Sequence, residues 1–157
     1  MNNYSAKGSS ISEIGTALLQ FKGVPLSLKG YAPFKEIYDT NAPMITTRCS
    51  RQVGKTLSMG AIIVIDGVIH PYTTAIYIAP LAVQASRFST MYLDGFLESP
   101  LVKKYWRDSS SRKNVFEKTL SNRSLIFLSY AQVESDSDRV RGIAGDFMHI
   151  DEVQDVQ

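Results

Sequence analysis

The sequence has little of what marks secreted or membrane-spanning proteins. Cys49 is the only cysteine among 157 residues, which excludes an internal disulfide framework and is typical of proteins from reducing compartments. The longest apolar runs, such as Ala61–Ile65, are much shorter than the roughly 20 residues of a membrane-spanning helix. The N-terminus, Met1–Tyr4, is polar, so we expect neither a signal peptide nor any membrane association.

Charge and composition exclude only the extreme classes of protein. The net charge of +2 is too small to indicate a nucleic-acid partner by itself. The chain contains 44% hydrophobic and 20% charged residues, which is ordinary for a globular domain, and its length suffices for one good core. It has no internal repeats and no low-complexity tracts. Function must therefore be inferred from local motifs.

Residues 49–56, Cys-Ser-Arg-Gln-Val-Gly-Lys-Thr, fit most of the signature of a phosphate-binding loop. That signature is a glycine, four further residues, and then Gly-Lys followed by Ser or Thr. Gly54, Lys55 and Thr56 match it, whereas Cys49 stands in place of the first glycine. The alternative interpretation is a Gly-Lys-Thr turn that only caps a helix.

The flanking segments give this loop the context that the signature requires. Residues 43–48 are rich in β-branched side chains and predict a short buried strand. Residues 57–65 are mostly apolar and predict a helix that begins near Gly54. Backbone N–H groups at the start of that helix would face the phosphates of a nucleotide, Lys55 would neutralise phosphate oxygens, and the Thr56 hydroxyl would bind Mg²⁺. The residues expected to contact the phosphates are Ser50, Arg51, Gln52, Val53, Gly54, Lys55 and Thr56.

A second motif lies far downstream, where the largely apolar run Asp146–Ile150 ends in the two carboxylates of Asp151 and Glu152. Such a run predicts a buried parallel strand, and the carboxyl end of such a strand is where an α/β sheet presents its site. Asp151 would hold Mg²⁺ through water, and Glu152 would act as general base on the attacking water. The alternative is an acidic first turn of a helix. Together the two motifs predict a nucleoside triphosphatase.

The remaining segments alternate between helical and strand patterns. Residues 1–30 predict a loosely packed lead-in to a domain that spans residues 31–157. The further elements are expected at 11–21 (a helix that docks on the core), 74–80 (a strand), 81–96 (a helix), and 114–118 with 124–130 (a hairpin). This alternation predicts an α/β fold with a mainly parallel sheet flanked by helices. The aromatic residues of 31–38 would either line a nucleotide base or fill the edge of the core.

These motifs resemble the large terminase subunit of tailed bacteriophages. The likeness is carried by the loop Ser50–Thr56, by the spacing of Ala79, Pro80, Gln84 and Arg87 after the second strand, and by Arg141 and Gly142 ahead of Asp151 and Glu152. It covers roughly residues 30–157, the N-terminal ATPase part of such a protein. The resemblance implies a P-loop NTPase fold of the RecA-like or ASCE-like kind, with ATP and Mg²⁺ as cofactors. In that family this domain hydrolyses ATP to translocate double-stranded DNA into a preformed capsid.

The resemblance also implies roles for individual arginines. Arg51 would reach the γ-phosphate as a catalytic residue beside Glu152. Arg141 would act as an arginine finger in the site of a neighbouring subunit, because a guanidinium neutralises charge that develops on the γ-phosphate, an effect worth roughly 10³–10⁵ in rate. Alternatively, Arg141 pairs with nearby aspartates on the surface, where ion pairs contribute little, or Arg139 takes the finger role.

The expected partners follow from the same resemblance. They are double-stranded DNA, a portal protein and a small terminase subunit, bound by a homo-oligomeric ring in the host cell cytoplasm. Residues 103–107 and 112–113 form a basic stretch interleaved with aromatic side chains. This stretch would either grip DNA without sequence specificity or form a solvated helix face.

The sequence departs from the family in its extent. It continues only to Gln157, five residues beyond Glu152, whereas a full large subunit continues into a coupling segment and a nuclease domain. We therefore expect a truncated ATPase domain and no nuclease domain. Its sheet would lack strands beside the strand that ends at Asp151, and we expect poor ATP hydrolysis by this piece alone.

Two other functions are compatible with the motifs. A helicase-type ATPase is one, because Asp151–Asp155 resembles the Asp-Glu-x-Gln-Asp segment of a large helicase superfamily. Arg51 and Gln52 depart from the small residues usual in helicase phosphate loops. A non-catalytic nucleotide-binding domain with a decayed site is the other, although Lys55 and Thr56 are intact.

Overall fold

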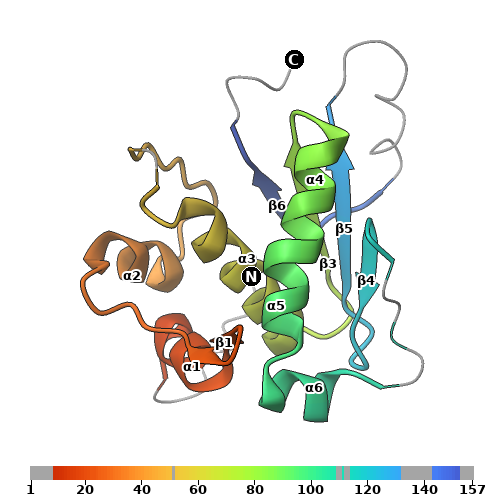
Figure 1. Ribbon diagram of the computed structural model, residues 1–157, viewed down its shortest axis with the longest axis horizontal. Coiled ribbons are helices and arrows are strands. Elements are labelled where there is room, and N and C mark those ends of the chain that lie inside the picture. The colour runs from red at the N-terminus through yellow and green to blue at the C-terminus, as the bar shows by residue number, and fades with distance from the viewer. Residues whose placement is uncertain (1–8, 51, 109–110, 112–113, 132–142, 153–157) are drawn as a thin grey trace.

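The computed structural model describes residues 9–50, 52–108, 111, 114–131 and 143–152. They form an α/β fold in which a mixed sheet of four strands is flanked by helices (Figure 1). The strand order is β4-β5-β3-β6, with β3 (Thr74–Ala79), β4 (Glu117–Thr119), β5 (Leu125–Tyr130) and β6 (Phe147–Ile150). β3 is parallel to both β5 and β6, whereas β4 pairs antiparallel with β5. The predicted strands at 74–80 and 146–150 and the predicted hairpin are therefore confirmed.

β3 is the central strand, and its sequence explains why. Its residues Thr-Ala-Ile-Tyr-Ile-Ala are almost entirely apolar, as expected for a strand with neighbours on both sides and little contact with water. Ile76 and Tyr77 point to opposite faces of the sheet, because side chains alternate along a strand. Both are 1% exposed, so both faces of the sheet are covered at this strand.

The main helices lie on one face of the sheet. α3 (Lys55–Ile69) contacts β6, since Asp66 lies against His149, and the segment from α4 onward contacts β3, since Phe88 stacks on Tyr77. His149 and Tyr77 are paired in register and so share a face of the sheet. The predicted helix at 81–96 is confirmed, with one wider π-helical turn inside it: α4 (Ala82–Phe88), η1 (Ser89–Leu93) and α5 (Asp94–Leu97).

The N-terminal described residues pack on this core rather than extending from it. Their elements are α1 (Ile11–Leu18), β1 (Gln20–Phe21), β2 (Val24–Pro25) and α2 (Ala32–Asp39), and α6 (Pro100–Trp106) follows α5. A capping box at Ser10 and Glu13 begins α1. Ser12 donates from its backbone N–H and its hydroxyl to the Asp39 carboxylate at 2.8 and 2.7 Å, which ties α1 to α2. In the described part of the chain, no helix is both long and apolar enough to cross a bilayer.

The strand predicted over residues 43–48 is wrong, because residues 41–50 form no helix or strand. Met44 is 83% exposed and Ile45 47% exposed. β-branched residues favour a strand only where a neighbouring strand can accept and donate the backbone hydrogen bonds. Within the described residues no strand pairs with this segment.

The strand that precedes Asp151 is parallel, as predicted, but it is not fully buried. β6 is the edge strand of the sheet, and its exposure alternates. Met148 is 59% exposed and Ile150 38% exposed on one face. Phe147 and His149 on the other face are partly buried against the helices. The apolar run therefore reflects an edge strand with one covered face rather than a strand enclosed on both sides.

Candidate functional site

The start of α3 lies toward the carboxyl edge of the sheet. Near the other end of this helix, the Gly67 carbonyl accepts hydrogen bonds from Asn122 Nδ2 at 2.8 Å and from Ser124 Oγ at 2.7 Å. Both donors immediately precede β5, at the amino edge of the sheet. Lys55 is the first residue of this helix, and about 18 Å of helix length separates it from Gly67. This is close to the length of a six-residue strand, so the start of α3 approaches the carboxyl edge (Figure 1).

The loop before α3 contains two residues with a left-handed backbone. Gly54 caps the helix with φ +85°, and Gln52 has φ +62°. A Cβ atom at Gly54 would meet nothing within 4 Å, so the left-handed backbone, and not a lack of space, favours glycine there. The helical hydrogen bonds begin with Ser58 N–H to the Gly54 carbonyl at 2.9 Å. The earlier N–H groups of the helix start are those that can bind an anion.

Asp151 is held by the central strand. Its backbone N–H donates to the Ile78 carbonyl at 3.0 Å, which continues the β3–β6 ladder by one residue. The Tyr77 hydroxyl donates to Asp151 Oδ2 at 3.2 Å, and the Glu152 N–H donates to Oδ1 at 3.0 Å. Burial first, and then the nearby Asp151 charge, raise the pKa of Tyr77 well above its usual range. Tyr77 therefore stays a neutral donor that fixes the direction of this carboxylate.

Glu152 is held by the helix that follows β3. Gln84 Nε2 donates to Glu152 Oε2 at 3.0 Å, and Gln84 Oε1 accepts from the Leu81 N–H at 3.1 Å. Glu152 has φ +49°, a conformation that non-glycine residues rarely adopt. The sequence shows that Gln84 follows β3 closely, but nothing in the sequence indicates that Gln84 binds Glu152.

A buried pair of side chains joins α3 to β6 below this edge. Asp66 Oδ2 and His149 Nε2 lie 3.7 Å apart. Burial raises the pKa of Asp66 to about 7 and lowers the pKa of His149 to about 4. Near neutral pH His149 is thus uncharged, and Asp66 holds a proton for part of the time. No motif in the sequence indicates this pair, because both side chains belong to largely apolar segments.

The two predicted halves of the site lie on the same side of the molecule (Figure 1). Figure 1 shows the start of α3 and the carboxyl end of β6 on that side. Within the described residues, no hydrogen bond or ion pair links Lys55 or Thr56 to Asp151 or Glu152. No described group of three or more His, Cys, Asp or Glu side chains could hold a metal alone. The carboxylate of Asp151 and the hydroxyl of Thr56 are oxygen donors, the type of ligand that Mg²⁺ accepts together with substrate phosphates.

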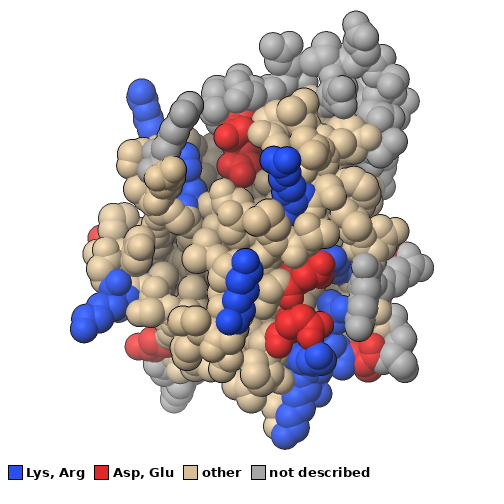
Figure 2. Space-filling view, in the orientation of Figure 1, with Lys and Arg blue, Asp and Glu red and all other residues tan. Residues whose placement is uncertain are grey.

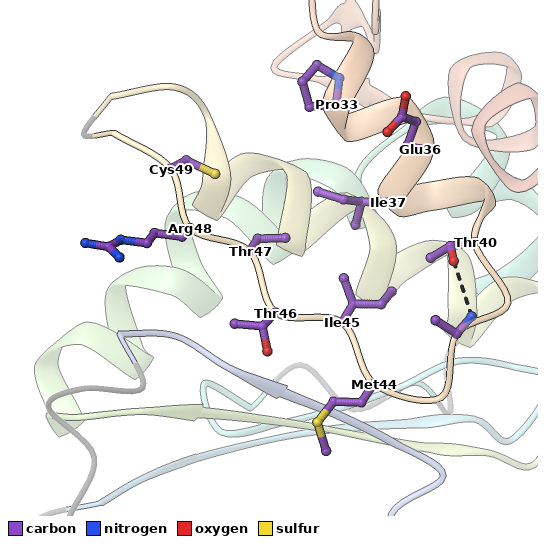
Figure 3. A pocket seen from close by; sticks show the side chains of 11 residues that line it. Pro33, Glu36, Ile37, Thr40, Met44, Ile45, Thr46, Thr47, Arg48 and Cys49 are labelled. Carbon is purple, nitrogen blue, oxygen red and sulfur yellow. Dashed lines mark hydrogen bonds between the residues drawn. The ribbon is translucent and has the colours of Figure 1, made fainter.

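A hollow of about 470 Å³ lies beside the phosphate loop, between α2 and residues 42–49 (Figure 3). Ile37 and Ile45 point into it, and it extends to Cys49. The aromatic residues expected in this region mostly fill the core instead. Tyr38 is 2% exposed and donates to the Ser58 carbonyl at 3.2 Å. The nucleotide-base role predicted for the rings of 31–38 has no support at this position.

The predicted arginines and part of the basic stretch lie outside the described residues: Arg51, Arg139, Arg141, Arg112 and Lys113. On α6, Lys103 pairs with Glu98, and Lys104 Nζ lies 4.9 Å from the centre of the Tyr105 ring. Figure 2 shows Lys and Arg interspersed with Asp and Glu on this face, and the described residues form no single basic patch there. Residues 103–105 are exposed on α6, and a DNA grip by this stretch stays a prediction.

Comparisons with protein-family models, with curated proteins and with solved structures find no match for this chain. Any functional assignment therefore depends on the residues and on their geometry.

Proposed function

We propose that this chain is the ATP-hydrolysing motor domain of a viral DNA-packaging terminase, which translocates double-stranded DNA into a procapsid. One observation carries the proposal. Gly54, Lys55 and Thr56 begin a helix whose start approaches the carboxyl edge of the sheet, and Asp151 and Glu152 follow β6 at that same edge. This arrangement supports a phosphate site at the helix start with carboxylates beside it, as in P-loop NTPases. The RecA-like or ASCE-like form of the fold is part of this proposal.

The chain's own groups divide the work of hydrolysis in this proposal. The free N–H groups at the start of α3 and the Lys55 ammonium hold the phosphate oxygens of ATP. The Thr56 hydroxyl and Asp151 hold Mg²⁺, which offsets the negative charge of the phosphates when it is bound. Glu152 accepts a proton from the attacking water, so that the water oxygen can bond to the γ-phosphorus while the bond to ADP breaks.

The hollow beside the loop supports a position for the nucleoside. It ends at Cys49, where the phosphate loop begins. It is a shallow, open hollow lined by both apolar and polar side chains. Ile37 and Ile45 would give the base an apolar contact. ATP would then extend from the hollow along the loop to the start of α3.

The proposed partners, assembly and location come from the sequence resemblance. The partners are double-stranded DNA, a portal protein and a small terminase subunit. The chain would act in a homo-oligomeric ring in the host cell cytoplasm. Arg51 and Arg141 keep their predicted roles at the γ-phosphate, as catalytic residues in the same site and in the neighbouring subunit's site.

The test is nucleotide binding measured by calorimetry. Lys55→Ala should weaken the binding of Mg²⁺-ATP by roughly tenfold or more, because the lost ammonium interacts directly with phosphate. Lys29→Ala is the matched control, since Lys29 is an exposed lysine in a loop before α2. Equal affinity in the wild type and both variants, or no binding in any of them, would reject the phosphate site.

A further inference from the structure

Glu152 is the carboxylate that the proposed function uses as general base, and its position depends on a side chain from another element. Gln84 Nε2 donates to Glu152 Oε2 at 3.0 Å. The residues lie 68 positions apart in the sequence, so the fold of β3, α4 and β6 brings them together. The contact leaves the second oxygen of Glu152 without a hydrogen bond from the described residues.

The orientation of the Gln84 amide is itself fixed. Its Oε1 accepts from the Leu81 N–H at 3.1 Å, at the start of α4. An amide that accepts on one side must present its NH₂ group on the other. The NH₂ group therefore faces the carboxylate, and a flipped amide would lose both interactions.

The backbone of Glu152 also needs support from its side chain. Its φ of +49° is uncommon for a residue with a Cβ atom, and such conformations persist where the surrounding contacts hold them. Glu152 N–H donates to Asp151 Oδ1, and the side chain binds Gln84. The backbone and the carboxylate are thus fixed from two directions.

From this geometry we propose that Gln84 is a positioning residue that anchors one oxygen of Glu152 and so directs the other toward the attacking water. This inference rests on the proposed function, because it assigns Gln84 a part in the same hydrolysis. A held carboxylate needs no reorganisation when the water reacts, and misplacement of about 1 Å can cost roughly a hundredfold in rate.

The contact predicts a particular kinetic signature in single-turnover hydrolysis of Mg²⁺-ATP. Gln84→Ala should lower the rate of hydrolysis roughly tenfold to a hundredfold, while the affinity for Mg²⁺-ATP changes less than about twofold. Gln84→Glu keeps the size of the side chain but loses the NH₂ donor, so it should be no better than Gln84→Ala. The control is Val83→Ala, at a neighbouring exposed position of α4, which should leave the rate unchanged.

A double substitution separates positioning from a structural effect on α4. If Gln84 acts through Glu152, then Gln84→Ala should lower the residual rate of a Glu152→Gln protein by no more than about twofold. A further full loss in that background would overturn the inference, as would a Gln84→Ala protein with wild-type hydrolysis. In both cases the proposed phosphate site is still supported if the wild type binds Mg²⁺-ATP and Lys55→Ala does not. Since only slow hydrolysis is expected from this chain alone, the wild-type reaction is followed until one slow turnover is complete. No turnover on that timescale would overturn both the catalytic proposal and the role of Gln84.

Discussion

The two predicted halves of the site differ in how firmly the fold holds them. Asp151 and Glu152 follow a paired strand, and their carboxylates accept hydrogen bonds from Tyr77 of β3 and Gln84 of α4. The phosphate loop, residues 49–56, instead follows residues 41–48, which form no strand and are exposed. The comparison teaches that the two motifs are held by different elements. The acidic half is built on the sheet, whereas the phosphate half is fixed mainly by the helix that follows.

The difference can be traced to the edge of the sheet. β6 is the edge strand beside the helix α3, and Met148 and Ile150 on it are exposed. Residues 43–48 have a composition suited to a strand but no strand neighbour among the described residues. Without that neighbour, the backbone hydrogen bonds of a strand have no partner and the segment stays irregular.

The largest expected effect is on the free energy of unfolding. It is seen when a core residue under the acidic half and an exposed residue before the phosphate loop are each replaced by alanine. Tyr77 is 1% exposed and stacks on Phe88 with 3.8 Å between ring centres. Tyr77→Ala should lower the free energy of unfolding by about 3–5 kcal/mol, because it leaves a cavity in the core. Met44→Ala, at an 83% exposed side chain, should change it by less than about 0.5 kcal/mol. Urea unfolding measures both, and similar losses would break the comparison.

The buried Asp66–His149 pair links the two halves and predicts a pH effect. Burial raises the Asp66 pKa from 3.8 to about 7, so this group's contribution to stability falls as pH rises from about 4 to 7. Burial lowers the His149 pKa from 6.5 to about 4, so its contribution rises with pH between about 4 and 6.5. Asp66→Asn removes the falling contribution and should stabilise the protein at pH 7.5 by on the order of 2–4 kcal/mol.

A variant of His149 shows which of the two groups causes the pH dependence of stability. In His149→Gln the rising contribution is lost, so unfolding free energy should fall steadily as pH increases from 4 to 7. Urea titrations at several pH values give both curves. Parallel curves for the wild type and the two variants would show that neither buried group titrates as the structure indicates.

A smaller effect is expected at the cap of α3. Gly54 has φ +85°, and a left-handed backbone costs a residue with a Cβ atom roughly 1–2 kcal/mol. Gly54→Ala should therefore lower the free energy of unfolding by about that amount and weaken Mg²⁺-ATP binding. Gly54→Asn should recover part of the stability, because asparagine tolerates this conformation better. Full wild-type stability in Gly54→Ala would show that the loop does not need the left-handed turn.

The smallest effect concerns one hydrogen bond in the acidic half. Tyr77→Phe removes the hydroxyl that donates to Asp151 Oδ2 at 3.2 Å but keeps the stacked ring. The expected loss is about 1 kcal/mol in unfolding free energy, the usual net contribution of such a bond. Thermal unfolding compares it with Tyr77→Ala, and equal losses would mean that the ring contributes nothing.

The sequence predicted those parts of the fold that depend on local pattern. The apolar run at 74–80, the helix that begins after Gly54 and the turn between the strands of the hairpin each have a pattern that tertiary contacts only reinforce. The prediction of a strand at 43–48 was wrong, because a strand needs a neighbouring strand and composition does not show whether one is present. The contacts of Tyr77 with Asp151 and of Gln84 with Glu152 depend on which strands become neighbours, and no pattern along the chain reveals that.

The central claim is that both halves act on one bound nucleotide, and the effect of Asp151→Asn on ATP affinity tests it most directly. Affinity would be measured by calorimetry with Mg²⁺ and with a chelator, in wild type and variant. If Asp151 holds the Mg²⁺ of an ATP bound at Lys55, the variant should lose most of the gain in affinity that Mg²⁺ provides, while Mg²⁺-free ATP binds as it does to the wild type. An unchanged Mg²⁺ effect in Asp151→Asn would show that the acidic half does not meet the phosphate loop on one ligand.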